Sequence, residues 1–514
     1  MQSVSADWKA NQLNYFVDEA YTEIKLQIGD PDAMADATPT ANGEEPFSNV
    51  AEVASEIDKY PVKYATLETN IWNLDGSCTI LPPNGYGEQG YIGDALGDDN
   101  GEYTTNPTIT ITFSQVFTDI IPGVTITWGE AYEEWANSFT VTAYNGSTQV
   151  AQEVVTGNTE LVSVVAFDIQ NYDKIVIEIT KWGLPRRRAR IKQIILGIEK
   201  TYKKADLMEY QHTMTVDALS AACPKSEIKF SVKNLDGEYN PDNPQGIAKY
   251  MLTRQMITAR YGYKINGAIE WIKAGTFFLS EWEMPQNGIT ATFTARDALE
   301  YMMDAYTGTT SGTLYQIATA AFTQAGLPLM SDGTNRWTID NSLQSINAPA
   351  TVDLGDSATI MEVLQYCANA ACCLFYQDRD GLLHIEPLAA GTTDYEINRF
   401  NSYQNSELQL SKQLKAININ NGQYVLSVGS IGDVQPISNP LISDTQAPVV
   451  AAWASDYLLN RQTLDGEFRI DPRLDPLDRI TNENQFSEST VLVTEVQIDF
   501  NGAFRGAYKG RRGA

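Results

Sequence analysis

The chain has 514 residues, of which 43% are hydrophobic and 20% charged, with a formal net charge of −29. This length allows several hydrophobic cores, and the composition is that of a folded globular protein. Affinity for nucleic acid depends on clusters of Lys and Arg, so the acidity disfavours a DNA-binding function. The five cysteines follow no regular spacing, which excludes a zinc-finger pattern and predicts reduced thiols.

No segment is apolar for long enough to cross a bilayer, since the most apolar short runs are residues 162–167 and 370–376. Residues 1–12 lack the apolar stretch of a signal peptide. Together with the cysteine pattern, this predicts a protein that assembles in the cytoplasm of the cell that makes it.

Residues 1–61 contain one strand-like segment, residues 21–28, followed by a stretch rich in Asp, Ala, Thr, Pro and Gly. We expect an amino-terminal arm with a surface loop. Such an arm can pair with the edge of a later sheet or with another subunit.

Residues 62–199 predict a β-sandwich, because short segments of alternating apolar residues recur between turn residues. These segments are residues 108–113, 124–128, 139–144, 150–155, 164–169 and 174–179. Together with residues 64–67, 72–76 and 181–194, the pattern resembles a discoidin-type, galactose-binding-like domain. In that family, loops at one end of the sandwich bind glycans or other surface ligands, sometimes beside a calcium ion.

Residues 200–305 predict a small antiparallel sheet or barrel. In the first strand, residues 227–233, apolar side chains alternate with polar ones, and a long polar loop follows. Further strands are predicted at residues 257–263, 275–282 and 289–296. On the last strand the expected inward side chains are Ile289, Ala291, Phe293 and Ala295.

Two helices and a hairpin predict a small α/β module over residues 306–395. The helices cover residues 314–325, ended by Gly326, and residues 360–371. The hairpin, residues 374–385, turns at Gly381. A second β domain is predicted over residues 396–514, with one helix starting at Pro448 and a final strand near the end of the chain. The expected fold class is therefore mainly β and multidomain, with the small α/β module between the β domains.

The order of turns and strands in residues 233–241, 260–263, 275–279 and 294–298 resembles the tube-forming domain of baseplate hub, or tail-tip, proteins of tailed bacteriophages. Residues 469–480, with the strand at 491–500, resemble the second tube-like domain of hubs from long-tailed phages. No residue in these segments carries a catalytic signature.

The resemblance implies a structural virion protein at the tail tip, assembled in the host bacterial cytoplasm. It implies a homotrimer that forms a ring and contacts the tail tube, distal tail and tape-measure proteins. Genomic DNA would pass through without specific binding, since an acidic lining repels phosphates.

A candidate glycan site comes from the segment between two sandwich strands. Trp128, Glu130, Tyr132 and Trp135 combine aromatic rings with carboxylates, which suits stacking and hydrogen bonding to sugars. The alternative for Trp128 is that it ends a strand and belongs to the core. Host-surface glycans are therefore one candidate partner.

Calcium is the one candidate cofactor. Asp94, Asp98, Asp99 and Asn100 place several oxygen ligands in one loop, although the spacing is not that of an EF-hand. A solvated turn is the alternative. The basic cluster Arg186, Arg187, Arg188 and Arg190 could bind phosphate, but pairing with carboxylates of the same sandwich is the favoured interpretation.

No catalytic residue is assigned, and the chain is not expected to be an enzyme. Residues 85–90 match the dinucleotide fingerprint in letters but lack the flanking strand and helix, so they predict a surface loop. The two histidines, His212 and His384, have no nucleophile-elbow motif beside them, and a Cys–His pair of His384 with Cys372 or Cys373 is a weak alternative. The remaining functional alternatives are a cell-surface carbohydrate-binding protein and a cell-wall-degrading tail enzyme.

Overall fold

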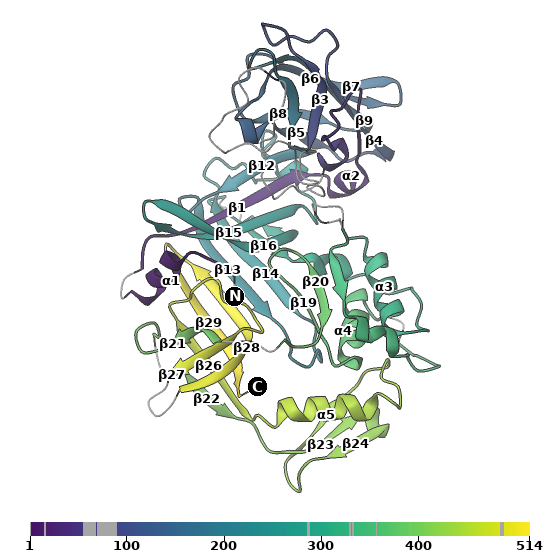
Figure 1. The fold of residues 1–514 in the computed structure, drawn as a ribbon, viewed down its shortest axis with the longest axis vertical. Helices are drawn as coiled ribbons and strands as arrows, with labels where there is room; N and C mark the ends of the chain where they lie inside the picture. The colour runs from purple at the N-terminus through teal and green to yellow at the C-terminus, as the bar shows by residue number, and fades with distance from the viewer. Residues whose placement is uncertain are drawn as a thin grey trace.

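The fold is given by a computed structural model, in which the upper lobe is a sandwich, the middle is a large sheet, and helices lie to one side (Figure 1). It describes residues 2–14, 17–54, 68, 90–284, 288–327, 330, 334–355, 357–389, 391, 393–403, 406–483 and 488–513. Within these residues, no helix is both long and apolar enough to cross a membrane. The predicted class, mainly β and multidomain, is confirmed.

The sandwich packs a five-stranded sheet, β2-β4-β9-β6-β7, against a three-stranded sheet, β11-β5-β8, with β3 and β10 paired beside them. Its strands are β2 (Thr38–Ala41), β3 (Tyr91–Leu96), β4 (Thr108–Phe117), β5 (Ile121–Thr127), β6 (Ala136–Asn145), β7 (Thr148–Val155), β8 (Val162–Ile169), β9 (Tyr172–Trp182), β10 (Arg188–Ile191) and β11 (Gln193–Ile195). Alternating side chains such as Ile109, Ile111 and Ile177 are buried between the sheets. Every predicted sandwich strand in residues 108–179 is present.

The amino-terminal segment is not a free arm. Helix α2 (Pro31–Asp36), strand β2 and the 3₁₀ turn η1 (Val50–Glu52) belong to the sandwich, because Ala33, Val50 and Val53 are buried in its core. The predicted start of the sandwich at residue 62, with residues 64–67 and 72–76, lies outside the described residues.

The large sheet has the strand order β12-β1-β15-β16-β17-β14-β13-β28-β29-β26-β22, with β21 and β27 attached through β28. Its first half contains β1 (Ala20–Gly29), β12 (Gly197–Tyr202), β13 (Leu207–Thr215), β14 (Lys225–Lys233), β15 (Met256–Ile265), β16 (Ala268–Glu283) and β17 (Thr290–Arg296). Its second half contains β21 (Thr393–Ile397), β22 (Glu407–Leu410), β26 (Gln462–Phe468), β27 (Arg479–Glu483), β28 (Glu488–Phe500) and β29 (Phe504–Arg512).

The four strands predicted in residues 226–296 lie side by side as β15-β16-β17-β14, all antiparallel. Ile228, Phe230 and Val232 are buried, as their alternation predicts. One inward assignment is wrong. Ile289 precedes β17, and its side chain is 54% exposed.

The two predicted β domains are not separate units. Strand β13 pairs with β28 from Tyr210 opposite Phe500 to Thr215 opposite Glu495, so one sheet runs through both. One hydrophobic core, including Tyr261, Phe293, Val496 and Tyr508, lies under both halves. An unpaired edge strand exposes backbone hydrogen-bonding groups. Here the pairing of β13 with β28 covers one edge of each half.

The amino terminus joins the same core. Strand β1 pairs with β12 on one side and β15 on the other, which confirms the expected pairing of this segment with a later sheet. The helix α1 (Ala6–Leu13), absent from the sequence prediction, begins at the N-cap Ser5, which accepts from the Trp8 backbone at 3.1 Å. Trp8 is fully buried against Tyr263, with ring centroids 5.0 Å apart.

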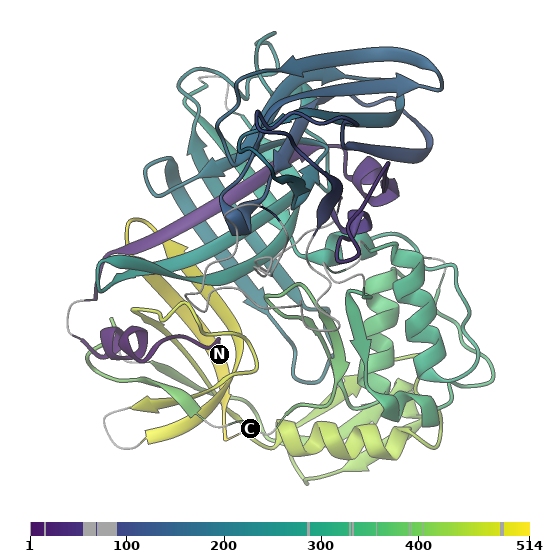
Figure 2. The ribbon, with the colours of Figure 1, turned by 45° about the horizontal axis from the view of Figure 1, so that its top comes forward.

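The α/β module lies beside the sheet, where the green helices gather in Figure 2. It contains α3 (Leu314–Ala325), α4 (Ile360–Ala370), β18 (Trp337–Ile339), β19 (Leu374–Gln377), β20 (Leu383–Glu386), and the turns η4 (Ala298–Met302) and η5 (Asn341–Ser345). Both predicted helices and the hairpin are confirmed, and Gly326 ends α3 at φ +63°.

The module is larger than the predicted residues 306–395. Its core also contains side chains from β23 (Leu414–Ile419), β24 (Tyr424–Ser427), β25 (Asp433–Ile437) and α5 (Ala447–Leu458). Ile417 and Val450, for example, are buried with Leu364. The predicted boundary at residue 396 therefore does not separate two cores, because the apolar face of α5 packs against the α/β module and not against the sheet.

Candidate functional site

The predicted glycan loop follows β5 and contains η2 (Glu130–Tyr132). Trp128 has no exposed surface, and its Nε1 donates to Ser163 Oγ at 2.7 Å. Its ring packs edge-on against Phe139 and Trp182, at 4.8 and 6.0 Å. Trp128 is therefore a core residue whose face no sugar can reach, as the alternative interpretation held.

The other three candidates have protein partners of their own. Glu130 forms an ion pair with Lys192. The Tyr132 ring lies 4.6 Å from the guanidinium of Arg190, and Trp135 is half-buried against the sandwich core. The loop therefore offers a polar surface with one partly exposed indole, and not a platform of free aromatic rings.

Beneath this loop lies a buried charge cluster that the sequence did not indicate. Glu134 is 2% exposed and accepts from Arg187 Nε at 2.7 Å and Trp182 Nε1 at 3.0 Å, with Arg190 at 3.6 Å. Burial raises the pKa of the Glu134 carboxyl, while the two arginines and the indole oppose that shift. The cluster closes the loop end of the sandwich.

All four arginines of the basic cluster pair with carboxylates of the same lobe. Arg186 meets Asp99 at 2.6 Å, Arg187 meets Glu134, Arg188 meets Glu45 at 2.7 Å, and Arg190 meets Glu68. The favoured interpretation, internal pairing, is confirmed. Side chains held in this way are poorly placed to bind phosphate.

Of the predicted calcium ligands, Asp94 lies within β3, whereas Asp98, Asp99 and Asn100 lie in the turn that follows it. Asp98 accepts from the backbone N–H groups of Asn100 and Glu102, at 2.7 and 2.9 Å, and these bonds lower the pKa of its carboxyl. Asp99 is held by Arg186. Across the described residues, no group of three or more His, Cys, Asp or Glu side chains is arranged to hold a metal ion.

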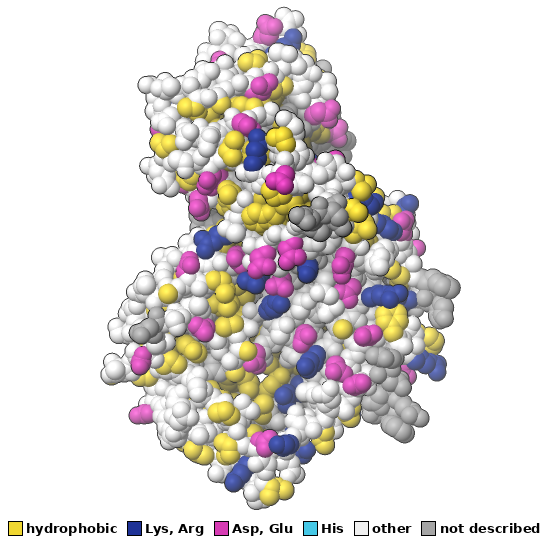
Figure 3. Space-filling view, turned by 180° about the vertical axis from the view of Figure 1, so that it is seen from behind, with side chains coloured by type: hydrophobic (Ala, Val, Ile, Leu, Met, Phe, Trp, Pro, Cys, Tyr) yellow, Lys and Arg dark blue, Asp and Glu magenta, His cyan; other side chains and the backbone are white. Residues whose placement is uncertain are grey.

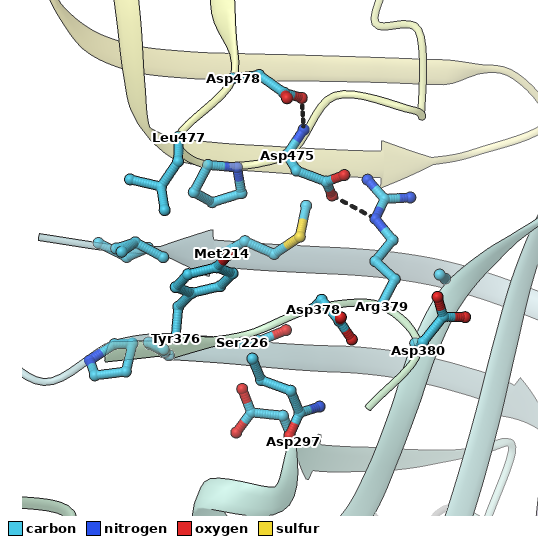
Figure 4. Close-up of a pocket in the computed structure, with 18 of the residues that line it drawn as sticks. Met214, Ser226, Asp297, Tyr376, Asp378, Arg379, Asp380, Asp475, Leu477 and Asp478 are labelled. Carbon is cyan, nitrogen blue, oxygen red and sulfur yellow. Dashed lines mark hydrogen bonds and ion pairs between the residues drawn. The ribbon is translucent and has the colours of Figure 1, made fainter. Parts of the chain in front are cut away.

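A pocket of about 330 Å³ lies where three parts of the chain meet (Figure 4). The turn between β19 and β20 brings Arg379 into it, buried to 8% exposure. Its guanidinium donates to Asp475 at 2.5 Å, to the carbonyls of Pro472 and Leu474 at 2.7 and 2.8 Å, and to that of Lys273 at 3.2 Å. Arg379 therefore joins the module to both halves of the sheet.

The same pocket contains a carboxyl with a displaced pKa. Asp297 is the N-cap of η4 and accepts from Leu299 N at 3.0 Å. Complete burial raises the pKa of Asp297 to about 7, against the opposing effects of that hydrogen bond and Arg296. Burial also raises the pKa of Asp478, on the opposite wall. Ser226 lines the same pocket, and its carbonyl accepts from the backbone N–H of Asp297 at 3.0 Å.

One histidine does meet a serine. His212 Nε2 lies 3.1 Å from Ser226 Oγ, and its Nδ1 lies 2.8 Å from the hydroxyl of Tyr261, where a catalytic triad would place a carboxylate. Burial first, and Arg379 second, hold the pKa of His212 well below its usual value. An imidazolium would therefore be strongly disfavoured, and the arrangement suits a structural hydrogen-bond network.

His384 does not pair with cysteine. Its Nε2 lies 2.9 Å from Asp378, and its ring stacks on Tyr376 with centroids 4.9 Å apart. Burial raises the pKa of Cys372 and of Cys373 to about 12, so both thiols stay protonated at neutral pH. The fingerprint at residues 85–90 and Cys78 lie outside the described residues, apart from Gly90.

Apolar side chains are exposed at the end of the large sheet that β22 forms. Leu408 lies opposite Leu464, which is buried in the core, so both point to the inner face of the sheet. Yet Leu408 and Leu410 are 55% and 64% exposed, and Phe400 and Tyr403, just before them, are 61% and 54% exposed. Within the described residues, β22 pairs only with β26. The alternation Glu-Leu-Gln-Leu was the signal that the sequence analysis missed.

No family model matches this chain, and no curated protein sequence matches it. Solved structures do resemble it. The tail protein from Neisseria meningitidis MC58 is 11% identical, with a TM-score of 0.42 over 62% of this chain and 94% of that one. The 43 kDa tail protein of prophage MuSo2 from Shewanella oneidensis is 14% identical, with a TM-score of 0.41 over 60% and 93%.

The E. coli c3393 protein, a component of the type VI secretion system, is 11% identical, with a TM-score of 0.37 over 60% of this chain and 74% of that one. Tail proteins, a phage baseplate and a secretion-system component are thus among the solved structures that this chain resembles.

Proposed function

We propose that this protein is a structural subunit of the tail tip of a tailed phage or a related injection machine, where three copies form a closed ring. The observation that carries the proposal is the uncovered inner face at β22, where Leu408 and Leu410 continue the apolar core face into solvent. An exposed apolar sheet edge is a site for pairing with another chain.

The two ends of the sheet differ, which favours a head-to-tail contact. The β22 end carries Glu407 opposite Asp465, with the exposed Leu408 and Leu410 beside them, whereas β12, at the other end, carries Glu199 and Lys200, paired with Lys25 and Glu238. A contact between unlike surfaces generates a ring when the rotation between copies closes. The number of copies in the ring, three, is what the sequence resemblance to hub proteins implies.

In this role the chain would contact the tail tube, distal tail and tape-measure proteins. A net charge of −29 would let genomic DNA pass without adhering. The sandwich, an outlying lobe in Figure 1, would contact the host surface or a neighbouring tail protein. No catalytic step is proposed, since neither His212 nor His384 has the partners that one needs.

The test is the position of the chain in assembled tails. Cryo-electron microscopy should show a threefold ring of this chain at the tail tip, with β22 at the contact between copies. The double change Leu408→Asp and Leu410→Asp should remove the chain from purified tails while the isolated protein stays folded. Leu235→Asp, at a turn where Leu235 is 80% exposed, is the matched control and should assemble normally. A peripheral position, or normal assembly of the double variant, would refute the ring.

A further inference from the structure

A second groove lies at the waist between the sandwich and the large sheet. Its volume is about 450 Å³, and strands form both of its walls. Acidic and basic side chains gather at this waist when the molecule is seen from behind (Figure 3). Ligand sites occur preferentially between domains, where two surfaces converge.

The sandwich wall is the outer face of the β11-β5-β8 sheet. Strand register places Gln193, Thr127 and Val162 in one row across this face. The next row contains Thr125 and Ile195. Val162 is 48% exposed, so this wall combines hydroxyl and amide groups with accessible apolar surface.

The opposite wall is the outer face of β12, β1, β15 and β16. Arg260 pairs with Glu23 at 2.7 Å, and Lys25 pairs with Glu199 at 2.9 Å. The Arg260 guanidinium also lies 4.2 Å from the centre of the Trp271 ring. These pairs hold charged donors and acceptors in fixed positions on strands, which lowers the entropy cost of binding.

The groove differs in charge from the rest of the surface. It is lined by four cations, Lys25, Lys192, Arg260 and Lys273, and three carboxylates, Glu23, Glu130 and Glu199, in a protein of net charge −29. The carboxylates of the groove would repel a polyanion, and its cations would repel a polycation. Uncharged hydroxyl groups can use both, because a hydroxyl donates and accepts.

We propose that this groove binds a neutral oligosaccharide. Sugar hydroxyls would bond to the paired charges and to Thr127 and Gln193, while the C–H faces of the rings would lie on the exposed side chain of Val162. Of the four residues assigned from sequence, only Glu130 lines this groove. The inference rests on the host-contact part of the proposed function and does not require the ring.

The experiment uses the full-length protein and isothermal titration calorimetry. The probes are chitotetraose and maltotetraose as neutral sugars, a heparin tetrasaccharide as a polyanion, and acidic and basic octapeptides. At least one neutral sugar should bind. Val162→Arg, which places a long side chain in the groove, should weaken that binding by about tenfold or more. The conservative change Val162→Thr should retain it.

Val154→Arg is the matched control, because Val154 is a 58% exposed strand valine of the same lobe outside the groove. It should bind like the unchanged protein. The inference is overturned if no neutral sugar binds, if a peptide or heparin binds instead, or if Val162→Arg and Val154→Arg behave alike. Loss of binding after Trp135→Ala, with Val162→Arg unaffected, would move the site to the loop. Tail assembly of the same variants, measured in parallel, separates this result from the fate of the ring.

Discussion

The loop end of the sandwich and the β22 end of the large sheet differ in whether their side chains are buried and paired or exposed to solvent. At the loop end, Glu134 is enclosed by Arg187, Arg190 and Trp182, and Trp128 is fully buried. At the β22 end, Leu408 and Leu410 belong to the core face and yet meet solvent. A region whose apolar and charged side chains are all buried or paired within one chain needs no partner. An apolar core face that remains exposed to solvent is instead a candidate contact surface for a second chain.

The largest effect on the free energy of unfolding is expected at the loop end of the sandwich. Trp128→Ala should lower the free energy of unfolding by about 3–5 kcal/mol, because it removes a fully buried indole and leaves a cavity. Urea denaturation of the full-length protein, followed by circular dichroism, measures this. Trp135→Ala, at a half-buried position in the same loop, is the control and should cost much less. Equal costs would mean that Trp128 is not the core residue of this loop.

The junction between the parts can be tested through pH. The pKa of Asp297 rises from 3.8 to about 7 on folding, so the folded state holds a proton that the unfolded chain releases. The stability contribution is therefore fully present below about pH 4 and is lost as the pH rises to about 7. The loss is on the order of a few kcal/mol, by the free energy of a pKa shift of this size.

Asp297→Asn should remove this pH dependence, since Asn keeps an acceptor for Leu299 N and cannot ionise. Urea midpoints of the two proteins at pH 5 and pH 8 make the comparison. The unchanged protein should lose more stability than the variant between these values. Parallel pH profiles would show that Asp297 does not titrate in this range.

The smallest effect on stability is expected at the open end. Leu408→Asp with Leu410→Asp should change the free energy of unfolding of the isolated chain by only about 0.5 kcal/mol, because both side chains are already exposed. Thermal denaturation of the monomer measures this, and tail incorporation of the same variant should be lost. Strong destabilisation of the monomer would mean that these leucines complete a core within one chain.

Much of the local structure could be predicted. Alternation in residues 227–233 and 257–263 identified β14 and β15 and their buried faces. Helix α3 begins with a capping box between Thr313 and Gln316 and ends at Gly326, so its limits are encoded by neighbouring residues. The arginine pairing was also foreseen, although the identity of each partner was not.

What the sequence by itself determined was thus which segments are strands or helices and which face of each is apolar, because these follow from periods of 2 and 3.6 residues. The tertiary structure alone decided that β13 pairs with β28, that β1 lies between β12 and β15, and that Trp8 fills the common core. It also decided that Trp128 is enclosed while Leu408 is not. Alternation gives a strand its two faces but does not name its neighbours, since pairing and burial depend on residues far apart in the chain.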